Sequence, residues 1–537
     1  MSYQPETSYD AEHKIWSGPV ERFHFAPDLS IGEIIFHEMR RHPKQVAQVS
    51  ATEHTLLARS ELHQNSMRVA SYMRQIGLRQ SDIVGIMARN STHISAVAYA
   101  CFFNGIAFHS LNVVYEKDTI RKLFSITAPK IIFCDGDEYE KLKEATASLN
   151  TQIVTMRNHP PGVTKIEDLL NTPIEPNFEP ARLEQGVQQT LAILCSSGTT
   201  GTPKAVTITN SQKIFNSSTL LTTADVQYSH STLDWISGLV ALVTSGVFST
   251  KRIIADNTFD PAILLRIIEE YKVTWLLQPP SHMAMLVNCP EFEEADLSSL
   301  RYYLYGGGRC SVEVQETVRS RLDHDCLHFG YGCTELGTMA TMNRNYDAKP
   351  NSVGRLLPGF KIKILNDEGK ALGPDEVGEV CVTNGQYWAG YYGNPEESHK
   401  IRDANLWFHT GDLGYMDEDG FLFIVERKKE MLKYQNIMYY PNEVEEVIAK
   451  MPGVSEVCVF GVWNQFNGDE AAAAVVKKFG ADFHAQDVVD YVADHVDAKY
   501  KQLNAGAIIM DDLARSANGK TNRNATKAYF LEAKDRS

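Results

Sequence analysis

Paired cysteines are missing from this chain. Its nine cysteines are spread thinly over 537 residues, and no two of them form a C-x-x-C pair. A zinc ribbon or a disulfide scaffold needs pairs at short spacing, so neither is indicated. The odd number and the wide spacing favour reduced thiols, as in a cytosolic protein.

Long apolar runs and targeting signals are also scarce. The most apolar stretch, Trp235–Phe248, is interrupted by Ser, Gly and Thr, and it is shorter than the ~20 residues that span a bilayer. The polar N-terminal segment does not resemble a signal or transit peptide. The C-terminal residues AKDRS differ from the S-K-L peroxisomal address. We expect a cytoplasmic protein with no transmembrane segment, and the sequence leaves peroxisomal import by another route open.

Positive charge is in short supply. Lys and Arg number 52 against 67 Asp and Glu, which gives a net charge of −15. An acidic chain is a poor candidate for general binding of nucleic acid or anionic membranes. Any anionic ligand needs a local, built site. The oligomeric state is left open.

What the sequence does contain is an alternation of helix and strand periods. The predicted elements are helices Ile31–Arg41, Glu61–Ile76, Pro261–Tyr271 and Val312–Leu322, and strands Ile83–Met87, Lys130–Cys134, Val273–Leu277, Tyr302–Tyr305 and Cys326–Phe329. This order favours parallel α/β sheets, which bind ligands at the loops after their strands.

The pattern changes after about residue 350. Short alternating strands, Lys361–Leu365, Glu379–Thr383 and Phe421–Glu426, predict a β-rich subdomain. A separate α+β unit follows the charged run Glu426–Glu430, which is either a hinge or a solvated strand end. We therefore predict an α/β protein with two domains. A large N-terminal domain, residues 1–425, holds two α/β subdomains and the β-rich one, and a small α+β C-terminal domain covers residues 426–537.

One loop is rich in glycine and hydroxyl groups. An apolar strand from Leu191 leads into Ser196, Ser197, Gly198, Thr199, Thr200 and Gly201, and then into Lys204 and a second strand, Ala205–Ile208. Hydroxyls and backbone N–H groups suit polyphosphate oxygens, and the lysine adds a point charge. A flexible hairpin would also fit this pattern. The loop is not a P-loop, because a strand rather than a helix follows it.

Four further segments follow in order along the chain. They are Gly330–Glu335 (GYGCTE), Trp407–Asp412 (WFHTGD), Val425–Lys429 (VERKK) and Asn518–Lys520 (NGK). Together with the Ser196–Lys204 loop they resemble the signatures of the adenylate-forming superfamily, which includes acyl- and aryl-CoA synthetases, firefly luciferase and peptide-synthetase adenylation domains. The resemblance extends roughly from Ile31 to Lys527.

The resemblance implies a two-step reaction with ATP, Mg²⁺ and coenzyme A. A carboxylate attacks the α-phosphate of ATP to give acyl-AMP and pyrophosphate, and the thiol of coenzyme A then displaces AMP. The small domain is expected to be mobile and to rotate near Glu426 between the two steps.

The family pattern also implies residue roles. The residues that would hold the β- and γ-phosphates are Ser196, Ser197, Gly198, Thr199, Thr200, Gly201 and Lys204. Tyr331 and Gly332 would lie at the adenine, and Asp412 and Arg427 would hold the ribose. Glu335 would hold Mg²⁺. The catalytic residues would be Lys520, Lys433 and Thr334, which would contact the α-phosphate. On pattern alone, Asp412 is typical of a turn, Thr334 and Glu335 of a helix N-terminus, and Lys520 of an exposed surface.

The expected acyl pocket contains Trp235, Ser237, Gly306, Gly307 and Gly308. Asp234-Trp235-Ile236 stands where luciferases carry an aromatic-His-His-Gly stretch, which argues against a luciferin substrate. Trp235 either narrows the tunnel or lies in the core. The three glycines leave space for a flat or an extended acid, so the substrate is expected to be a fatty or aryl acid.

Two residues depart from the family pattern. Ala205 and Asn436 both stand where relatives usually carry glycine, and the loop of Asn436 lines the tunnel for the thiol. The expected function is an AMP-forming acid–CoA ligase, with adenylation better supported than transfer to coenzyme A. The alternatives are a luciferase-like or other adenylating enzyme that does not use coenzyme A, and a weakly active nucleotide-binding homologue.

Overall fold

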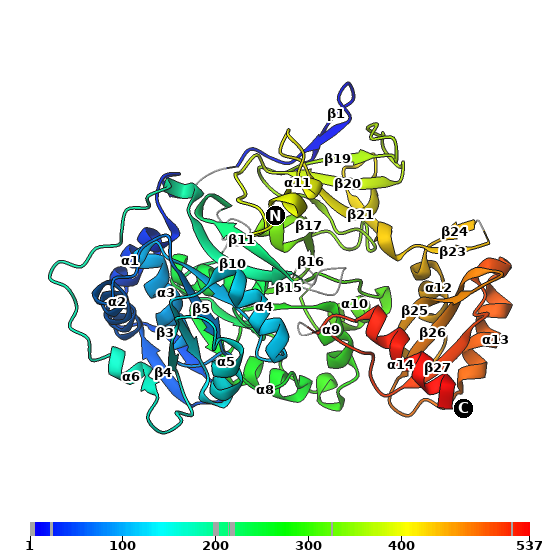
Figure 1. Ribbon diagram of the computed structural model, residues 1–537. Helices are drawn as coiled ribbons and strands as arrows, with labels where there is room; N and C mark the ends of the chain where they lie inside the picture. The colour runs from blue at the N-terminus through cyan, green and yellow to red at the C-terminus, as the bar shows by residue number, and fades with distance from the viewer. Residues whose placement is uncertain are drawn as a thin grey trace.

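The computed structural model describes residues 6–21, 25–196, 203–212, 214, 221–323, 326–435, 437–516 and 519–536. Its strands form two mainly parallel sheets covered by helices, an antiparallel sheet, and a smaller mixed sheet near the C-terminus. Figure 1 shows the first two in blue to green, the antiparallel sheet above them in yellow, and the last in orange to red at one side. The predicted α/β class, with a large N-terminal and a smaller C-terminal domain, is confirmed.

The N-sheet is the first α/β layer. Its strands are ordered β11-β10-β6-β5-β7-β8-β9. They are β5 (Ile83–Met87), β6 (Ala107–Ser110), β7 (Ile131–Cys134), β8 (Gln152–Thr155), β9 (Thr164–Lys165), β10 (Thr190–Ser196) and β11 (Lys204–Thr209). Strand β10 pairs antiparallel with β11, and Ser196 lies opposite Lys204. This pairing holds together both ends of the glycine- and hydroxyl-rich loop.

The central sheet carries the strand ends that face the candidate site. Its order is β18-β17-β16-β15-β14-β12-β13-β3-β4. The strands are β3 (Val46–Ser50), β4 (Thr55–Ala58), β12 (Val226–Ser229), β13 (Lys251–Ile254), β14 (Trp275–Gln278), β15 (Tyr302–Gly306), β16 (Leu327–Gly332), β17 (Met339–Asn343) and β18 (Arg355–Leu356). Strands β14, β15 and β16 are parallel, so their carboxyl ends meet at one edge.

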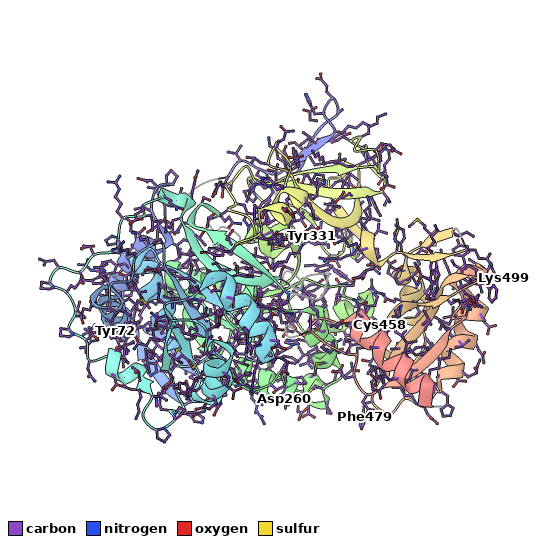
Figure 2. The ribbon with its side chains drawn as sticks, viewed as in Figure 1. Tyr72, Asp260, Tyr331, Cys458, Phe479 and Lys499 are labelled. Carbon is purple, nitrogen blue, oxygen red and sulfur yellow. The ribbon has the colours of Figure 1, made fainter. Side chains whose placement is uncertain are left out.

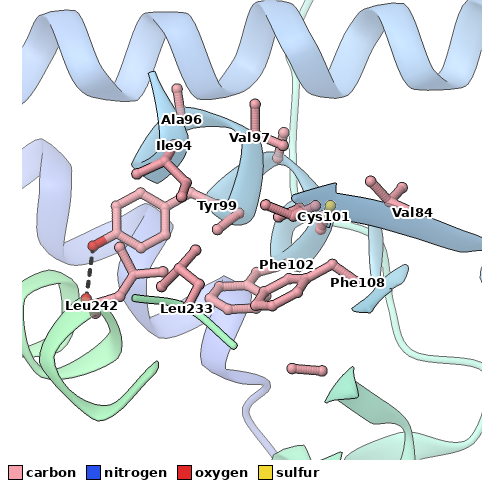
Figure 3. Close-up of a cluster of buried hydrophobic side chains, with 14 of the residues drawn as sticks. Val84, Ile94, Ala96, Val97, Tyr99, Cys101, Phe102, Phe108, Leu233 and Leu242 are labelled. Atoms are coloured by element: carbon pink, nitrogen blue, oxygen red, sulfur yellow. Dashed lines mark hydrogen bonds between the residues drawn. The ribbon is translucent and has the colours of Figure 1, made fainter. Parts of the chain in front are cut away.

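Helices pack between the two sheets. They are α1 (Ile31–Arg41), α2 (Arg59–Gln75), α3 (Ile94–Asn104) and α7 (Ile236–Val247). Ser30 and Glu33 form a capping box that starts α1. One apolar cluster joins these helices to both sheets. Within it, the Tyr99 hydroxyl donates to the Leu242 carbonyl at 2.9 Å, as Figure 3 shows.

The β-rich subdomain pairs two strands from the start of the chain with four strands from residues 361–427. Its order is β1-β2-β19-β20-β21-β22, with β1 (Ser8–Asp10), β2 (Ile15–Ser17), β19 (Lys361–Leu365), β20 (Gly378–Thr383), β21 (Phe408–Met416) and β22 (Leu422–Arg427). Trp16 is buried there, 1% exposed, among Ile362, Ile364 and their neighbours. Figure 1 shows the blue N-terminal strand beside the yellow sheet.

The C-terminal domain has its own core. Its strands are β23 (Leu432–Tyr434), β24 (Ile437–Tyr439), β25 (Val454–Asn464), β26 (Gly468–Lys477) and β27 (Gly506–Met510), and its helices are α12 (Pro441–Ile448), α13 (Ala485–His495) and α14 (Arg523–Arg536). It contacts the large domain beside α9 (Pro280–Val287) and α10 (Val312–Arg319). Asn288 donates to the Ser455 hydroxyl at 2.7 Å, and Lys478 pairs with Glu313.

The remaining described helices cover the outer faces of the sheets. They are α4 (Lys117–Thr127), α5 (Tyr139–Ala145), α6 (Ile166–Leu169), α8 (Pro261–Tyr271) and α11 (Pro395–Ile401). The predicted bounds of helices Ile31–Arg41 and Pro261–Tyr271 and of strand Ile83–Met87 are confirmed, and other predicted elements end within a few residues of their observed bounds. All nine cysteines are free thiols, as expected. Among the described helices, none combines the length and apolar composition that crossing a membrane requires.

Candidate active site

Asp412 is the centre of a charged cluster. It lies in β21 opposite Arg427 of β22, so the expectation that it occupies a turn is wrong. Arg427 Nε lies 3.0 Å from one carboxylate oxygen, and the Tyr331 hydroxyl donates to the other at 2.6 Å. The Asp412 residue is only 7% exposed. Both oxygens of this buried carboxylate are therefore oriented by partners that also belong to the predicted set.

Tyr331 lies near the carboxyl end of strand β16, beside the Asp412 carboxylate. It lies on β16, and Figure 2 places it where the β-rich subdomain meets the central sheet. Burial raises the pKa of Tyr331, and the Asp412 carboxylate raises it further. The same carboxylate raises the pKa of Arg427. Tyr331 thus stays a neutral hydroxyl donor while Asp412 and Arg427 form the ion pair.

Glu335 and Lys204 both contact Tyr391. Glu335 lies in the 3-10 turn Thr334–Leu336 that follows β16, and its carboxylate accepts from the Tyr391 hydroxyl at 2.7 Å. Lys204 Nζ lies 4.9 Å from the Tyr391 ring centre and 2.7 Å from Glu397. Tyr391 and Glu397 therefore position two predicted residues, although no motif in the sequence marked either of them.

Most of the predicted phosphate loop lies outside the described residues. This applies to Ser197, Gly198, Thr199, Thr200 and Gly201. The structure describes both of its ends, Ser196 and Lys204, as paired residues at the edge of the N-sheet. The loop therefore begins and ends beside the Tyr391 cluster.

Lys520 reaches this site from the C-terminal domain. A Cβ atom added to Gly307 would lie 3.0 Å from both Lys520 Cε and Nζ. Burial lowers the pKa of Lys520 to about 8, the positive charge of Arg427 lowers it further, and Asp412, Cys333 and Glu335 oppose the shift. Lys520 thus shares one electrostatic environment with residues of the large domain.

The segment that carries Lys520 is held by close backbone packing. Ser516 donates to the Lys520 carbonyl oxygen through its backbone N–H at 2.8 Å and its hydroxyl at 3.0 Å. Gly519 has a φ of +77°, and a Cβ atom there would lie 2.8 Å from His282 Nε2. The segment can approach α9 closely because residue 519 has no side chain.

His282 and Phe259 are site neighbours that the sequence prediction missed. Their rings stack with centroids 3.5 Å apart and planes 7° apart. Burial lowers the pKa of His282 to about 3, so the ring that faces Gly519 is neutral at physiological pH. One signal was available, since His282 follows the carboxyl end of β14, where ligands of parallel sheets bind.

The expected acyl-pocket residues lie at the start of α7 (Trp235 and Ser237) and at the end of β15 (Gly306, Gly307 and Gly308). A Cβ atom on Gly306 would clash with the Gly330 carbonyl, whereas Gly308 has its nearest neighbour, Pro280, at 3.8 Å. Trp235 caps α7 and is only partly buried, so it is not a core residue. Ser237 donates to the Ser231 hydroxyl at 2.8 Å.

Asp234 has a structural role in the Asp234-Trp235-Ile236 segment. Its side chain is buried, and burial raises the pKa of this carboxyl. Thr232 and Asn112 donate to its two oxygens at 2.5 and 2.9 Å. The carboxylate is thus satisfied within the large domain and supports the turn before α7.

Lys433 is not brought to this site. It lies exposed on β23, and its backbone N–H donates to Asp469 at 3.0 Å. Within the described residues, no ion pair or hydrogen bond joins its side chain to the Asp412 cluster. Asn436, the other residue of interest in that hairpin, lies outside the described residues.

The donor set can accommodate Mg²⁺ that arrives with ATP. In the described part of the chain no group of three or more His, Cys, Asp or Glu side chains has the arrangement of a metal site. Glu335 supplies one hard carboxylate, which binds the same tyrosine, Tyr391, that Lys204 contacts. Mg²⁺ in proteins is often held by one or two carboxylates together with substrate phosphates, so this site fits the ion.

The fold and this site define an adenylate-forming enzyme. The family model described as "AMP-binding enzyme" matches residues 35–392, and the model described as "AMP-binding enzyme C-terminal domain" matches residues 443–520. The chain therefore belongs to the AMP-binding enzyme family.

Curated and solved relatives agree with this assignment. The chain is 27% identical to luciferin 4-monooxygenase of Photinus pyralis over 97% of this chain and 98% of that one. It is 28% identical to 4-coumarate–CoA ligase 3 of Arabidopsis thaliana over 87% and 85%. The crystal structure of ATP-bound MatB from Rhodopseudomonas palustris superposes with a TM-score of 0.82, at 24% identity over 94% of this chain and 99% of that one, and shows the fold.

Proposed function

We propose that this enzyme activates a fatty or aryl carboxylic acid with ATP and transfers the acyl group to coenzyme A. The observation that carries the proposal is the position of Lys520. This residue belongs to the C-terminal domain, yet it lies against Gly307 and within the field of Asp412, Arg427 and Glu335. The two domains together thus assemble one charged site.

The chemical problem of the first step is that two anions must meet. The substrate carboxylate has to approach the α-phosphate of ATP, so catalysis consists mostly of positioning and charge neutralisation. Lys520 would neutralise the developing charge, and Thr334 would donate to the α-phosphate. Asp412 would accept from the ribose hydroxyls, with Arg427 beside it, while Tyr331 and Gly332 would contact the adenine. Mg²⁺ would be held by Glu335 and would neutralise phosphate charge when bound.

The phosphate loop would hold the β- and γ-phosphates. Lys204 is the first residue of β11 after the loop, and its Nζ is paired with Glu397 at 2.7 Å. Binding of a polyphosphate would compete with this carboxylate for the lysine. Lys204 would therefore exchange Glu397 for phosphate oxygens when ATP binds.

Transfer to coenzyme A requires a second arrangement of the domains. We place the hinge at Glu426, between domains of residues 1–425 and 426–537, and this rotation would carry Lys433 toward the site. Glu426 is 7% exposed, and Asn442 donates to the Val425 carbonyl at 2.6 Å. The rotation would also break the Asn288–Ser455 hydrogen bond.

A pyrophosphate-release assay tests this function. A panel of fatty and aryl acids is supplied with Mg-ATP, with and without coenzyme A, and the products are analysed for thioester. We expect pyrophosphate and a coenzyme A thioester with at least one acid. Lys520→Ala should slow adenylation by roughly 10²–10³-fold, whereas Lys450→Ala, which removes an exposed lysine of the same domain, should not.

The other outcomes distinguish the alternatives. Pyrophosphate release without thioester, accompanied by an amide product or by oxygen consumption, supports an adenylating enzyme that does not use coenzyme A. Binding of ATP without turnover of any acid supports a weakly active homologue. Unchanged acyl-AMP formation in Lys520→Ala would refute the role proposed for that lysine.

A further inference from the structure

Two buried arginines line a cavity that includes none of the proposed adenylation residues. Arg59 begins α2 and is 2% exposed, and Arg252 lies on β13 and is 3% exposed. The cavity lies among α1, α2, α3, α7 and the strands beside them, where the helices of the two α/β sheets pack together. Tyr99 also lines it, and Figure 3 shows its hydroxyl directed to Leu242.

Within the described residues, neither arginine has a carboxylate within 4.0 Å. Arg59 donates to the Ser249 carbonyl at 2.6 Å, and Arg252 donates to the Ser95 hydroxyl and the Asn90 side-chain oxygen at 3.1 and 3.4 Å. These acceptors are all neutral. Buried arginine is rare unless it is paired, because removing an ionic group from water is strongly unfavourable.

No other group of the cavity supplies a negative charge. Burial lowers the pKa of Arg252 to about 10, so its guanidinium is still charged at pH 7. Burial raises the pKa of Tyr99, so this side chain is a neutral phenol. The acid that influences Arg59 is Glu38, which is already paired with Arg41 at 3.0 Å. Two positive charges thus face the cavity without a protein counter-charge.

The cavity also presents hydrogen-bond donors that have no acceptor. Arg59 and Thr250 both line the cavity, and Arg59 Nε and the Thr250 hydroxyl are buried without a hydrogen-bond partner among the described residues. A buried donor without an acceptor destabilises the folded state. An acceptor placed in the cavity would satisfy both donors and neutralise part of the positive charge.

The size of the cavity limits what it can hold. The cavity volume is about 10 Å³, which is at the lower end of the roughly 10–15 Å³ that a single water-sized particle needs. A phosphate or a carboxylic acid is too large. Met39 and Leu62 form apolar walls, which would leave the outer oxygens of an oxyanion without donors.

We propose that this cavity is a binding site for a small monovalent anion of the halide class, chloride being the physiological example. The anion would lie between Arg59 and Arg252 and would bind the helices of the two α/β sheets together. It takes no part in adenylation. The proposal is therefore independent of the function proposed above, and its tests use neither ATP nor a carboxylic acid.

Anomalous diffraction from crystals soaked in bromide is the direct test. We expect a bromide peak in contact with both guanidinium groups of the unmodified protein. An ordered cavity without such a peak, with bromide bound only at the surface, would overturn the proposal. This measurement does not depend on whether any variant folds.

Thermal unfolding provides the second test. The midpoint is measured while chloride replaces gluconate at constant ionic strength, and we expect a saturable rise, because a ligand that binds only the folded state stabilises it. Arg252→Gln should lose the saturable rise, whereas Arg266→Gln, at an exposed arginine of α8, should keep it. An equal, unsaturated response in all three proteins would indicate a general salt effect and refute the site.

Discussion

The charge state of Lys520 predicts how the activity depends on pH. The pKa of this lysine is lowered from 10.5 to about 8, first by burial and then by Arg427. The proposed role requires the ammonium form. With a pKa of about 8, about nine-tenths of the free enzyme carries this charge at pH 7 and about one-tenth at pH 9. We therefore expect kcat/KM for adenylation to fall about tenfold between pH 7 and pH 9.

The enzyme–substrate complex should behave differently. An anionic α-phosphate beside Lys520 favours the ammonium form and raises the pKa of the lysine. The pH profile of kcat reports the complex, and that of kcat/KM reports the free enzyme. The basic limb of the kcat profile is therefore expected at higher pH than the basic limb of the kcat/KM profile.

The same titration should affect the stability of the folded state, but here the charged form of Lys520 is unfavourable. The folded state lowers the pKa of Lys520 and so disfavours its charged form. The resulting cost is fully present below pH 8 and disappears as the pH rises from about 8 to 10.5. It amounts to at most about 3 kcal/mol, and partial exposure of the side chain reduces it. Lys520→Met should therefore gain more stability at pH 7 than at pH 10.5.

The decisive assay is initial-rate pyrophosphate release from pH 6.5 to 9.5 at constant ionic strength. Lys520→Arg provides the matched comparison, because arginine remains charged throughout this range. Its rate is expected to be lower but flat above pH 8. If the wild-type limb near pH 8 persists unchanged in Lys520→Arg, another group causes it and the reasoning is refuted.

Three substitutions test neighbouring parts of the site. Gly519→Ala should slow adenylation at least tenfold, since its Cβ would lie 2.8 Å from His282 Nε2 in a φ > 0 conformation, and His282→Ala should restore part of the rate. Asp412→Ala should raise the Kd for ATP about tenfold or more and lower the free energy of unfolding by roughly 1–3 kcal/mol, because it leaves a buried donor without its acceptor. Glu397→Gln should lower the Kd for ATP a few-fold, because it releases Lys204 for the phosphates; calorimetric titration measures both constants.

Two of these substitutions, Gly519→Ala and Glu397→Gln, have a matched control. Gly480→Ala also places alanine at a positive φ, +79°, but with open space around it, so it should leave adenylation unchanged. Glu396→Gln removes an exposed carboxylate next to Glu397 and should not alter ATP binding. Equal effects in Gly480→Ala and Gly519→Ala would attribute the loss to backbone strain alone and contradict the proposed contact with His282. Weaker ATP binding in Glu397→Gln would show that this carboxylate supports the site rather than competes for Lys204.

The sequence determined the elements whose patterns are local. Helix α1 has its cap at Ser30 and its apolar residues on one face, and β5 is a short apolar run between polar turns, so both could be predicted with their bounds. The family motifs likewise identified Lys204, Tyr331 and Lys520 as candidates. These signals lie within a few residues of one another, and no long-range contact is needed to recognise them.

Only the tertiary structure decided which of these residues meet. Asp412 and Arg427 are partners because β21 and β22 pair in one register, and His282 contacts Gly519 because a loop of the C-terminal domain packs against α9. Arg59 and Arg252 line one cavity although 193 positions separate them along the chain. Their isolation from any carboxylate could not be predicted, because burial and pairing depend on how whole sheets and helices pack, which no local pattern encodes.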